Sequence, residues 1–197
     1  MAQNSYFVIY KPYQVMSQFS PSDGKKTLKD FFDVPKNVYP VGRLDFDSEG
    51  LLILTNDASL NHQLLHPKNA HEREYWAQVD GAVLPSSILQ ITKGVSINID
   101  GKLYQTKPCK AAIVLPEPQV PERFPPIRFR KEIPTTWLKL ILTEGKNRQV
   151  RKMTAAIGHP TLRLIRHRIE ALKLNEMQPG EMIEMDESAI KKALKIR

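Results

Sequence analysis

The sequence predicts an α+β fold, a mixed, mainly antiparallel sheet with flanking helices. Strand-like segments run along the whole chain, a few amphipathic helical segments lie between them, and neighbouring strands are suited to antiparallel pairing. A chain of 197 residues is also long enough to bury a substantial core. We therefore expect a single domain over residues 1–197, built from two subdomains that share one sheet.

The N-terminal third of the chain is expected to hold two strands and two helices. Residues 5–11 form the first strand, and Thr27 caps a short helix. Residues 51–55 are apolar almost throughout, which predicts a strand that is buried on both faces. Asp57 can then accept hydrogen bonds from the first N–H groups of a helix that ends at His66.

The middle of the chain is expected to be rich in strands. Residues 73–80 alternate in character, as a half-buried strand does. Residues 86–93 predict a short helix, and residues 95–99 and 102–115 predict a hairpin that continues into a long strand. Residues 115–134 contain six of the fifteen prolines, which predicts an exposed loop.

The C-terminal part completes the pattern with three strands and two helices. Residues 136–143 and 161–169 predict strands, and residues 147–157 predict a helix between them. The apolar stripe of that helix consists of Val150, Met153 and Ile157. A closing strand at residues 182–185 and a basic helix from Ser188 end the chain.

The charge of the chain points to a polyanionic partner. Lys and Arg number 29 against 21 Asp and Glu, a net charge of +8. Residues 145–173 carry eight basic side chains and the single acid Glu170. Arg148, Arg151 and Lys152 share one surface if they lie on the predicted helix. This clustering indicates contact with a phosphate backbone; a solvated basic face is the alternative.

Other features restrict the function. The N-terminus has no signal-peptide pattern and no stretch is apolar enough to span a membrane, so we expect a cytoplasmic protein. Cys109 is alone and can form neither an internal disulfide nor a zinc finger. His62 and His66 have a spacing suited to zinc, but Gln63 stands where a metalloprotease helix has Glu, so we expect no metal site. Glycine patterns that bind NAD or ATP are absent.

Two longer motifs are informative. Residues 42–57 read Gly-Arg-Leu-Asp-Phe-Asp-Ser-Glu-Gly-Leu-Leu-Ile-Leu-Thr-Asn-Asp, which places an acid beside a cation and turn-forming residues, directly before an apolar strand. Residues 144–153 read Glu-Gly-Lys-Asn-Arg-Gln-Val-Arg-Lys-Met. Both resemble the core motifs of the pseudouridine synthases of the RsuA/RluE branch. The resemblance implies that family's fold, with a central active-site cleft, and a cofactor-free isomerase that converts uridine in RNA to pseudouridine.

The same resemblance implies roles for individual residues. Asp45 is the catalytic residue, whose carboxylate attacks the sugar C1′ or removes a sugar proton, and Arg151 orients it and keeps it ionised. Arg43 fills the gap that the uridine leaves when it swings out of its stack. Tyr75 packs on the base and can move a proton, and Leu164 forms an apolar wall that excludes water. Phosphate contacts are implied for Arg148, Lys152, Arg163 and Arg166.

The resemblance also suggests the RNA. Residues 125–128, 133–138 and 161–166 are closer to the large-subunit than to the small-subunit members of the branch, so 23S rRNA is the expected partner of a monomeric enzyme. The first strand begins by Ser5, so we expect no separate N-terminal S4 RNA-binding domain. The alternatives are a small-subunit rRNA pseudouridine synthase and a non-catalytic RNA-binding assembly factor.

Overall fold

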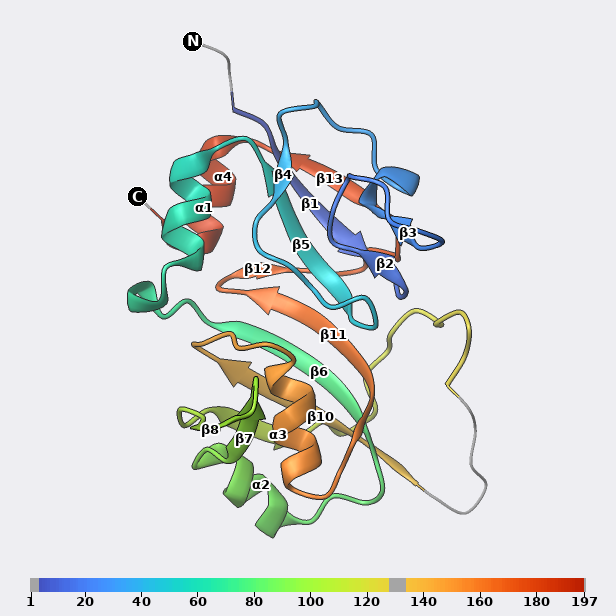
Figure 1. Cartoon of the computed structure of the whole chain (residues 1–197), viewed down its shortest axis with the longest axis vertical. Coiled ribbons are helices and arrows are strands. Elements are labelled where there is room, and N and C mark those ends of the chain that lie inside the picture. Colours follow the sequence, from blue (N-terminus) through green and yellow to red (C-terminus); the bar gives the residue numbers. More distant parts are fainter. Residues whose placement is uncertain (1–3, 128–133, 197) are drawn as a thin grey trace. The chain divides into compact units, whose positions relative to one another are not determined.

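The chain folds into two compact units, and the computed structural model describes residues 4–127 and 134–196. Unit 1 contains residues 1–71 and 166–197, and unit 2 contains residues 72–165 (Figure 1). Mainly antiparallel strands and short helices make up both units, which confirms the α+β prediction. The sharing of one sheet by two subdomains stays a prediction. Residues 128–133, with part of the predicted proline-rich loop, lie outside the described residues.

Unit 1 is built around the antiparallel strands β1 (Tyr6–Lys11) and β5 (Glu49–Thr55), and all six residues of β1 have a partner in β5. β13 (Met182–Met185) pairs with β1, and β4 (Tyr39–Pro40) pairs with the end of β5. The other elements of this unit are β2 (Val15–Met16), β3 (Lys26–Thr27), the 3-10 helices η1 (Leu28–Asp30) and η2 (Pro67–Asn69), α1 (Ala58–Leu65), β12 (Leu172–Lys173) and α4 (Glu187–Leu194).

Both central strands of unit 1 are buried along their whole length, which confirms the burial predicted for residues 51–55. One hydrophobic cluster is formed by Phe7, Ile9, Val15, Leu28, Phe32, Val38, Leu52 and Leu54. The helices α1 and α4 bury Leu60, Leu64, Ile190 and Leu194. Since β5 directly follows the loop that contains Asp45, this packing holds the C-terminal end of that loop in place.

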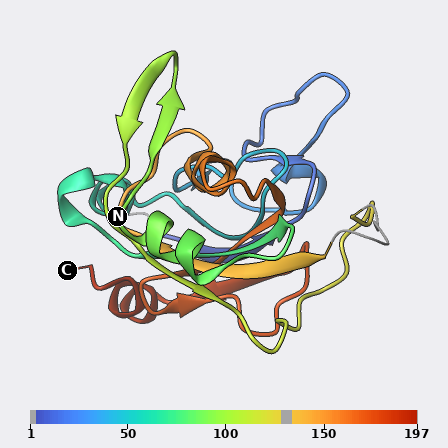
Figure 2. The ribbon, with the colours of Figure 1, turned by 90° about the horizontal axis from the view of Figure 1, so that it is seen from below.

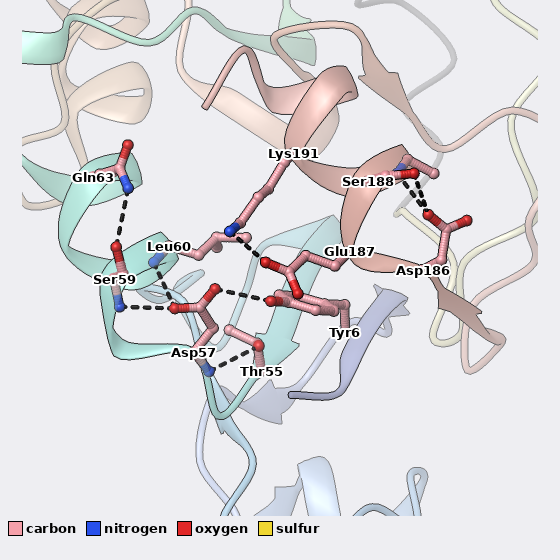
Figure 3. A network of polar contacts seen from close by, with 11 residues as sticks. Tyr6, Thr55, Asp57, Ser59, Leu60, Gln63, Asp186, Glu187, Ser188 and Lys191 are labelled. Carbon is pink, nitrogen blue, oxygen red and sulfur yellow. Dashed lines mark hydrogen bonds and ion pairs between the residues drawn. The ribbon is translucent and has the colours of Figure 1, made fainter. Parts of the chain in front are cut away.

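The start of α1 is fixed by Asp57, as predicted. Its carboxylate accepts hydrogen bonds from the N–H groups of Ser59 (2.9 Å) and Leu60 (3.0 Å), and from the hydroxyl of Tyr6 at 2.9 Å (Figure 3). Burial and this hydrogen bond raise the pKa of Tyr6 to about 12. One carboxylate therefore links the first strand to the helix that follows β5.

Unit 2 contains a sheet in which β10 (Thr135–Leu142) lies between β6 (Arg73–Asp80) and β9 (Lys110–Ile113). The bounds of β6 are those predicted, and all eight of its residues pair with β10. The other elements are α2 (Pro85–Thr92), β7 (Ser96–Ile99), β8 (Lys102–Gln105), α3 (Gln149–Ala156) and the first part of β11 (Thr161–Ile169). The hairpin of β7 and β8 projects from the rest of this unit (Figure 2).

The predicted long strand over residues 102–115 is wrong, because it is interrupted between β8, which pairs with β7, and β9, which pairs with β10. The N–H of Thr106 donates to the carbonyl of Val95 (3.0 Å), and the N–H of Val95 donates to the hydroxyl of Thr106 (2.9 Å). Gly94 permits this approach, since a Cβ there would collide with the carbonyl oxygen of Thr106. Pro108 has no N–H to offer a strand partner.

The core of unit 2 joins its strands to both helices. A single hydrophobic cluster includes Ala77, Val79, Ile91, Ile97, Leu138, Leu140, Val150, Met153, Ile157 and Leu164. The stripe predicted for the helix at residues 147–157 is therefore buried, which fixes the orientation of α3. Arg151 and Lys152 of the same helix are half-buried and do not belong to this cluster.

Candidate active site

The loop before β5 carries Arg43 and Asp45 on either side of the buried Leu44. Arg43 is exposed and Asp45 is half-buried. The N–H of Ser48 donates to the carbonyl of Asp45 (3.0 Å), which closes a turn directly after the acid. The side chains of Arg43 and Asp45 are thus at least partly accessible to solvent. The backbone between and after them is held by the buried Leu44 and by the turn that ends at Ser48.

The hydroxyl of Ser17 holds this loop from a second segment of unit 1. It accepts a hydrogen bond from the N–H of Leu44 (3.0 Å) and donates one to the carbonyl of the same residue (2.8 Å). Sequence patterns did not reveal Ser17, because a serine in a loop carries no signal of the distant backbone that it binds.

A fully buried lysine lies at the end of β1. The ammonium of Lys11 donates to the carbonyls of Pro12 (2.9 Å) and Val15 (2.8 Å). Burial lowers the pKa of Lys11 to about 7, and the charge of Glu49 partly opposes that shift. The charges of Asp45, Asp47 and Arg166 also act on it. A lysine inside an otherwise apolar strand, directly before a proline, is the sequence signal that could have revealed this position.

Replacement of Lys11 with Met is expected to change how stability depends on pH. The pKa of Lys11 is about 7 in the folded chain and 10.5 for an ordinary lysine side chain, so the unfolded state binds more protons between these two pH values. Its contribution to the free energy of unfolding therefore rises with pH, by about 1 kcal/mol per pH unit between about pH 7 and about pH 8.5, and falls as pH decreases. Urea unfolding of both proteins across this window measures the difference.

Lys191→Met is the matched control for this prediction. The hydrogen bond from Lys191 to Glu187 raises the pKa of Lys191, so this lysine stays protonated across the same window. The control should keep the wild-type slope. A Lys11→Met protein with the wild-type slope would contradict the assignment of a titrating buried ammonium.

In unit 2, Tyr75 and Leu164 belong to the same group of apolar side chains. Tyr75 lies on β6 opposite Leu140 of β10, is half-buried, and packs against the cluster that contains Leu164. Tyr75 and Leu164 thus border the same hydrophobic cluster of unit 2, and their contact with a base stays a prediction.

The helix α3 carries the predicted partner of the acid. The guanidinium of Arg151 is half-buried and donates to the carbonyl of Thr161 (3.3 Å). Lys152 is half-buried on the same helix. Arg148 was predicted inside the helix, but α3 begins at Gln149, and Arg148 is the exposed residue before it, with a left-handed backbone (φ +52°). Arg148 is therefore not part of the helix on which Arg151 and Lys152 lie.

A carboxylate organises the segment that leads into α3. Glu144 accepts hydrogen bonds from the hydroxyl of Tyr104 (2.6 Å), the N–H of Lys107 (2.9 Å) and the side chain of Gln149 (2.6 Å). Burial opposes its ionisation, but these bonds outweigh burial and lower the pKa of Glu144. The ammonium of Lys146 lies 4.9 Å from the centre of the Tyr104 ring. These contacts connect the hairpin of β7 and β8 to residues 144–149, the segment that leads into α3.

Two of the predicted phosphate contacts are buried. Arg163 and Arg166 are each 5% exposed. Arg163 donates to the carbonyl of Pro121 (2.9 Å), and Arg166 donates through Nε to the carbonyl of Leu51 (2.8 Å). These main-chain contacts favour a structural role for both guanidinium groups.

The predicted site residues are divided between the two units. Unit 1 holds Arg43, Asp45 and Arg166, and unit 2 holds Tyr75, Arg148, Arg151, Lys152, Arg163 and Leu164. The pairing of Asp45 with Arg151 and Tyr75 joins residues of different units and stays a prediction.

Within the described part of the chain, no group of three or more His, Cys, Asp or Glu side chains could hold a metal ion. The rings of His62 and His66 lie 5.3 Å apart, and His66 accepts a hydrogen bond from the N–H of Lys68. No helix among the described residues is long and apolar enough to cross a membrane.

Comparison with known proteins gives a consistent result. Residues 5–156 match the family model described as RNA pseudouridylate synthase. A "Ribosomal large subunit pseudouridine synthase E" of Vibrio parahaemolyticus is 48% identical over 184 residues, which cover 93% of this chain and 75% of the relative. A protein of the same name from Xanthomonas campestris is 44% identical over 188 residues, which cover 94% of this chain and 98% of the relative. The crystal structure of a pseudouridylate synthase, 27% identical, superimposes with a TM-score of 0.76 and covers 98% of this chain and 75% of that one. The chain belongs to the RNA pseudouridylate synthase family.

Proposed function

We propose that this protein converts a uridine of the large-subunit ribosomal RNA, 23S rRNA, to pseudouridine. The observation that carries the proposal is the loop in which Arg43 and Asp45 flank the anchored Leu44, in a chain of this family. The names of the relatives, which refer to the large ribosomal subunit, support the choice of RNA.

The reaction breaks the bond from the sugar to a ring nitrogen and re-forms it to a ring carbon, so it needs no oxidant, reductant or phosphoryl donor. Asp45 acts as nucleophile or base at the sugar, and the guanidinium of Arg151 keeps it ionised. Tyr75 and Leu164 enclose the extruded base, and the apolar cluster around them supports a water-poor pocket. Arg43, exposed on its loop, takes the place of the uridine in the RNA stack.

RNA contact is assigned chiefly to the basic residues near the start of α3. Arg148 is exposed and Lys152 is half-buried, so both can reach phosphates. Arg163 and Arg166 were included in the same role on sequence grounds, but their burial leaves them a smaller part in it. A monomeric state and a cytoplasmic location remain predictions.

Mapping of pseudouridines in ribosomal RNA tests the proposal. Cells that lack this protein are expected to lose one pseudouridine in 23S rRNA and to regain it when the gene is returned. Loss of a site in small-subunit RNA or tRNA would redirect the assignment to another substrate. A complete set of pseudouridines in the deletion strain would favour the non-catalytic assembly factor.

A further inference from the structure

The hydroxyl of Ser17 makes two hydrogen bonds to one residue, Leu44, which lies between the predicted site residues Arg43 and Asp45. It receives the N–H of Leu44 at 3.0 Å and donates to the carbonyl of Leu44 at 2.8 Å. Ser17 is 7% exposed and Leu44 is 8% exposed, so water has little access to replace either bond.

These two bonds act on two different peptide planes. The N–H of Leu44 lies in the plane that contains the Cα of Arg43, and its carbonyl lies in the plane that contains the Cα of Asp45. One hydroxyl therefore restrains the Cα positions from which the cation and the carboxylate extend. Loss of the Ser17 hydroxyl would remove the restraint on both peptide planes at once.

Ser17 is itself held in place by its surroundings. Lys11 donates to the carbonyl of Val15, two residues before it, and the N–H of Gln18 donates to the carbonyl of Met16 at 2.8 Å. The N–H of Leu28 then donates to the carbonyl of Gln18 (2.9 Å). The backbone that carries the Ser17 hydroxyl is therefore held by hydrogen bonds. For this reason the hydroxyl can keep the loop of Arg43 and Asp45 in one position.

We propose that Ser17 is a positioning residue of the isomerisation, which sets the orientation of Arg43 and Asp45 through the backbone of Leu44. The inference rests on the proposed function, because it assigns Ser17 a part in that reaction. Ser17 does not need to touch the RNA.

Thr55 provides a matched control at the other end of β5. Its buried hydroxyl also donates to a carbonyl, that of Ser5 (2.7 Å), and accepts an N–H, that of Asp57 (3.0 Å). Replacement of Thr55 with Ala therefore removes two hydrogen bonds of the same two kinds from the same unit. Neither bond involves the loop that contains Asp45. The two variants separate a general loss of packing from a loss of positioning.

The test compares wild type, Ser17→Ala and Thr55→Ala in single-turnover assays on 23S rRNA, below the melting temperature of the least stable variant. The Ser17→Ala protein is expected to bind RNA with a dissociation constant within about twofold of wild type and to react about 10- to 100-fold more slowly, because small misplacement of a reacting group costs rate rather than affinity. The Thr55→Ala protein should keep the wild-type rate. Amide hydrogen exchange at Leu44 should be faster in Ser17→Ala alone.

Four results would count against the inference. A wild-type rate for Ser17→Ala, or an equal loss of rate in both variants, would overturn it while the proposed function stands. Unchanged exchange at Leu44 would show that the hydroxyl does not hold the loop. A wild-type protein that forms no pseudouridine in ribosomal RNA would instead overturn the proposed function, and the inference with it.

Discussion

Replacement of Asp45 with Asn should abolish pseudouridine formation and leave RNA binding nearly unchanged. The two side chains have almost the same shape, but the amide can act neither as nucleophile nor as base at the sugar. Loss of a residue that takes part directly in the chemistry lowers the rate by roughly 10⁴-fold or more. Single-turnover assays on 23S rRNA, combined with filter binding of the same RNA, measure both quantities.

Charge reversal near the start of α3 provides the complementary control. Arg148→Glu and Lys152→Glu should weaken RNA binding and leave the reaction of bound RNA close to the wild-type rate, since phosphate contacts position the RNA rather than react with it. An Asp45→Asn protein that still forms product would remove Asp45 from the chemistry. Equal defects of binding and rate in all three variants would show that the two roles are not separable in this way.

Replacement of Gly50 with Ala should unfold unit 1 or destabilise it severely. Gly50 has φ +112°, a backbone conformation that residues with a side chain rarely adopt. A Cβ at this position would collide with the carbonyl oxygen of Arg166 and would lie 2.7 Å from the backbone nitrogen of Arg166. Both obstacles are backbone atoms, and β5 is buried along its length, so the strands have no room to separate. We expect the free energy of unfolding to fall by at least about 4 kcal/mol, as in severe cases of core overpacking and backbone strain.

Gly24→Ala is the matched control for this substitution. Gly24 also has a positive φ (+66°), but among the described residues beyond its two chain neighbours no atom lies within 4 Å of the position that a Cβ would take. Its replacement should cost only about 1 kcal/mol from backbone strain. Urea unfolding followed by far-UV circular dichroism compares the two variants; similar losses would show that the approach of Arg166 to Gly50 is not what requires glycine.

Much of the fold followed from local patterns. β6 was predicted at its observed bounds because its residues alternate, and the start of α1 because Asp57 is a strong capping residue. The break between β8 and β9 did not follow, since it depends on β8 pairing with β7 while β9 pairs with β10, a strand more than twenty residues further along the chain. The left-handed residue before α3 was also hidden, because arginine gives no local signal for that conformation.

The site was predictable only in part, because some of its contacts also join residues that are far apart in the sequence. The motif around Asp45 identifies the residues that would do the chemistry. It does not identify the hydroxyl of Ser17, whose partner lies 27 positions away in the sequence. The basic residues of β11 looked alike in the sequence, but Arg163 and Arg166 bond to carbonyls of distant segments. Charge can be counted from a sequence, whereas burial of a charge depends on contacts that folding creates.

The bond from Arg163 to Pro121 limits how the proline-rich loop can be exchanged between relatives. A chimaera that receives a shorter loop loses the carbonyl that this buried guanidinium uses, and a buried donor without an acceptor is costly. Grafts that retain an acceptor at the position of Pro121, or that replace Arg163 with an apolar residue in the same step, should therefore yield more folded protein than simple deletions.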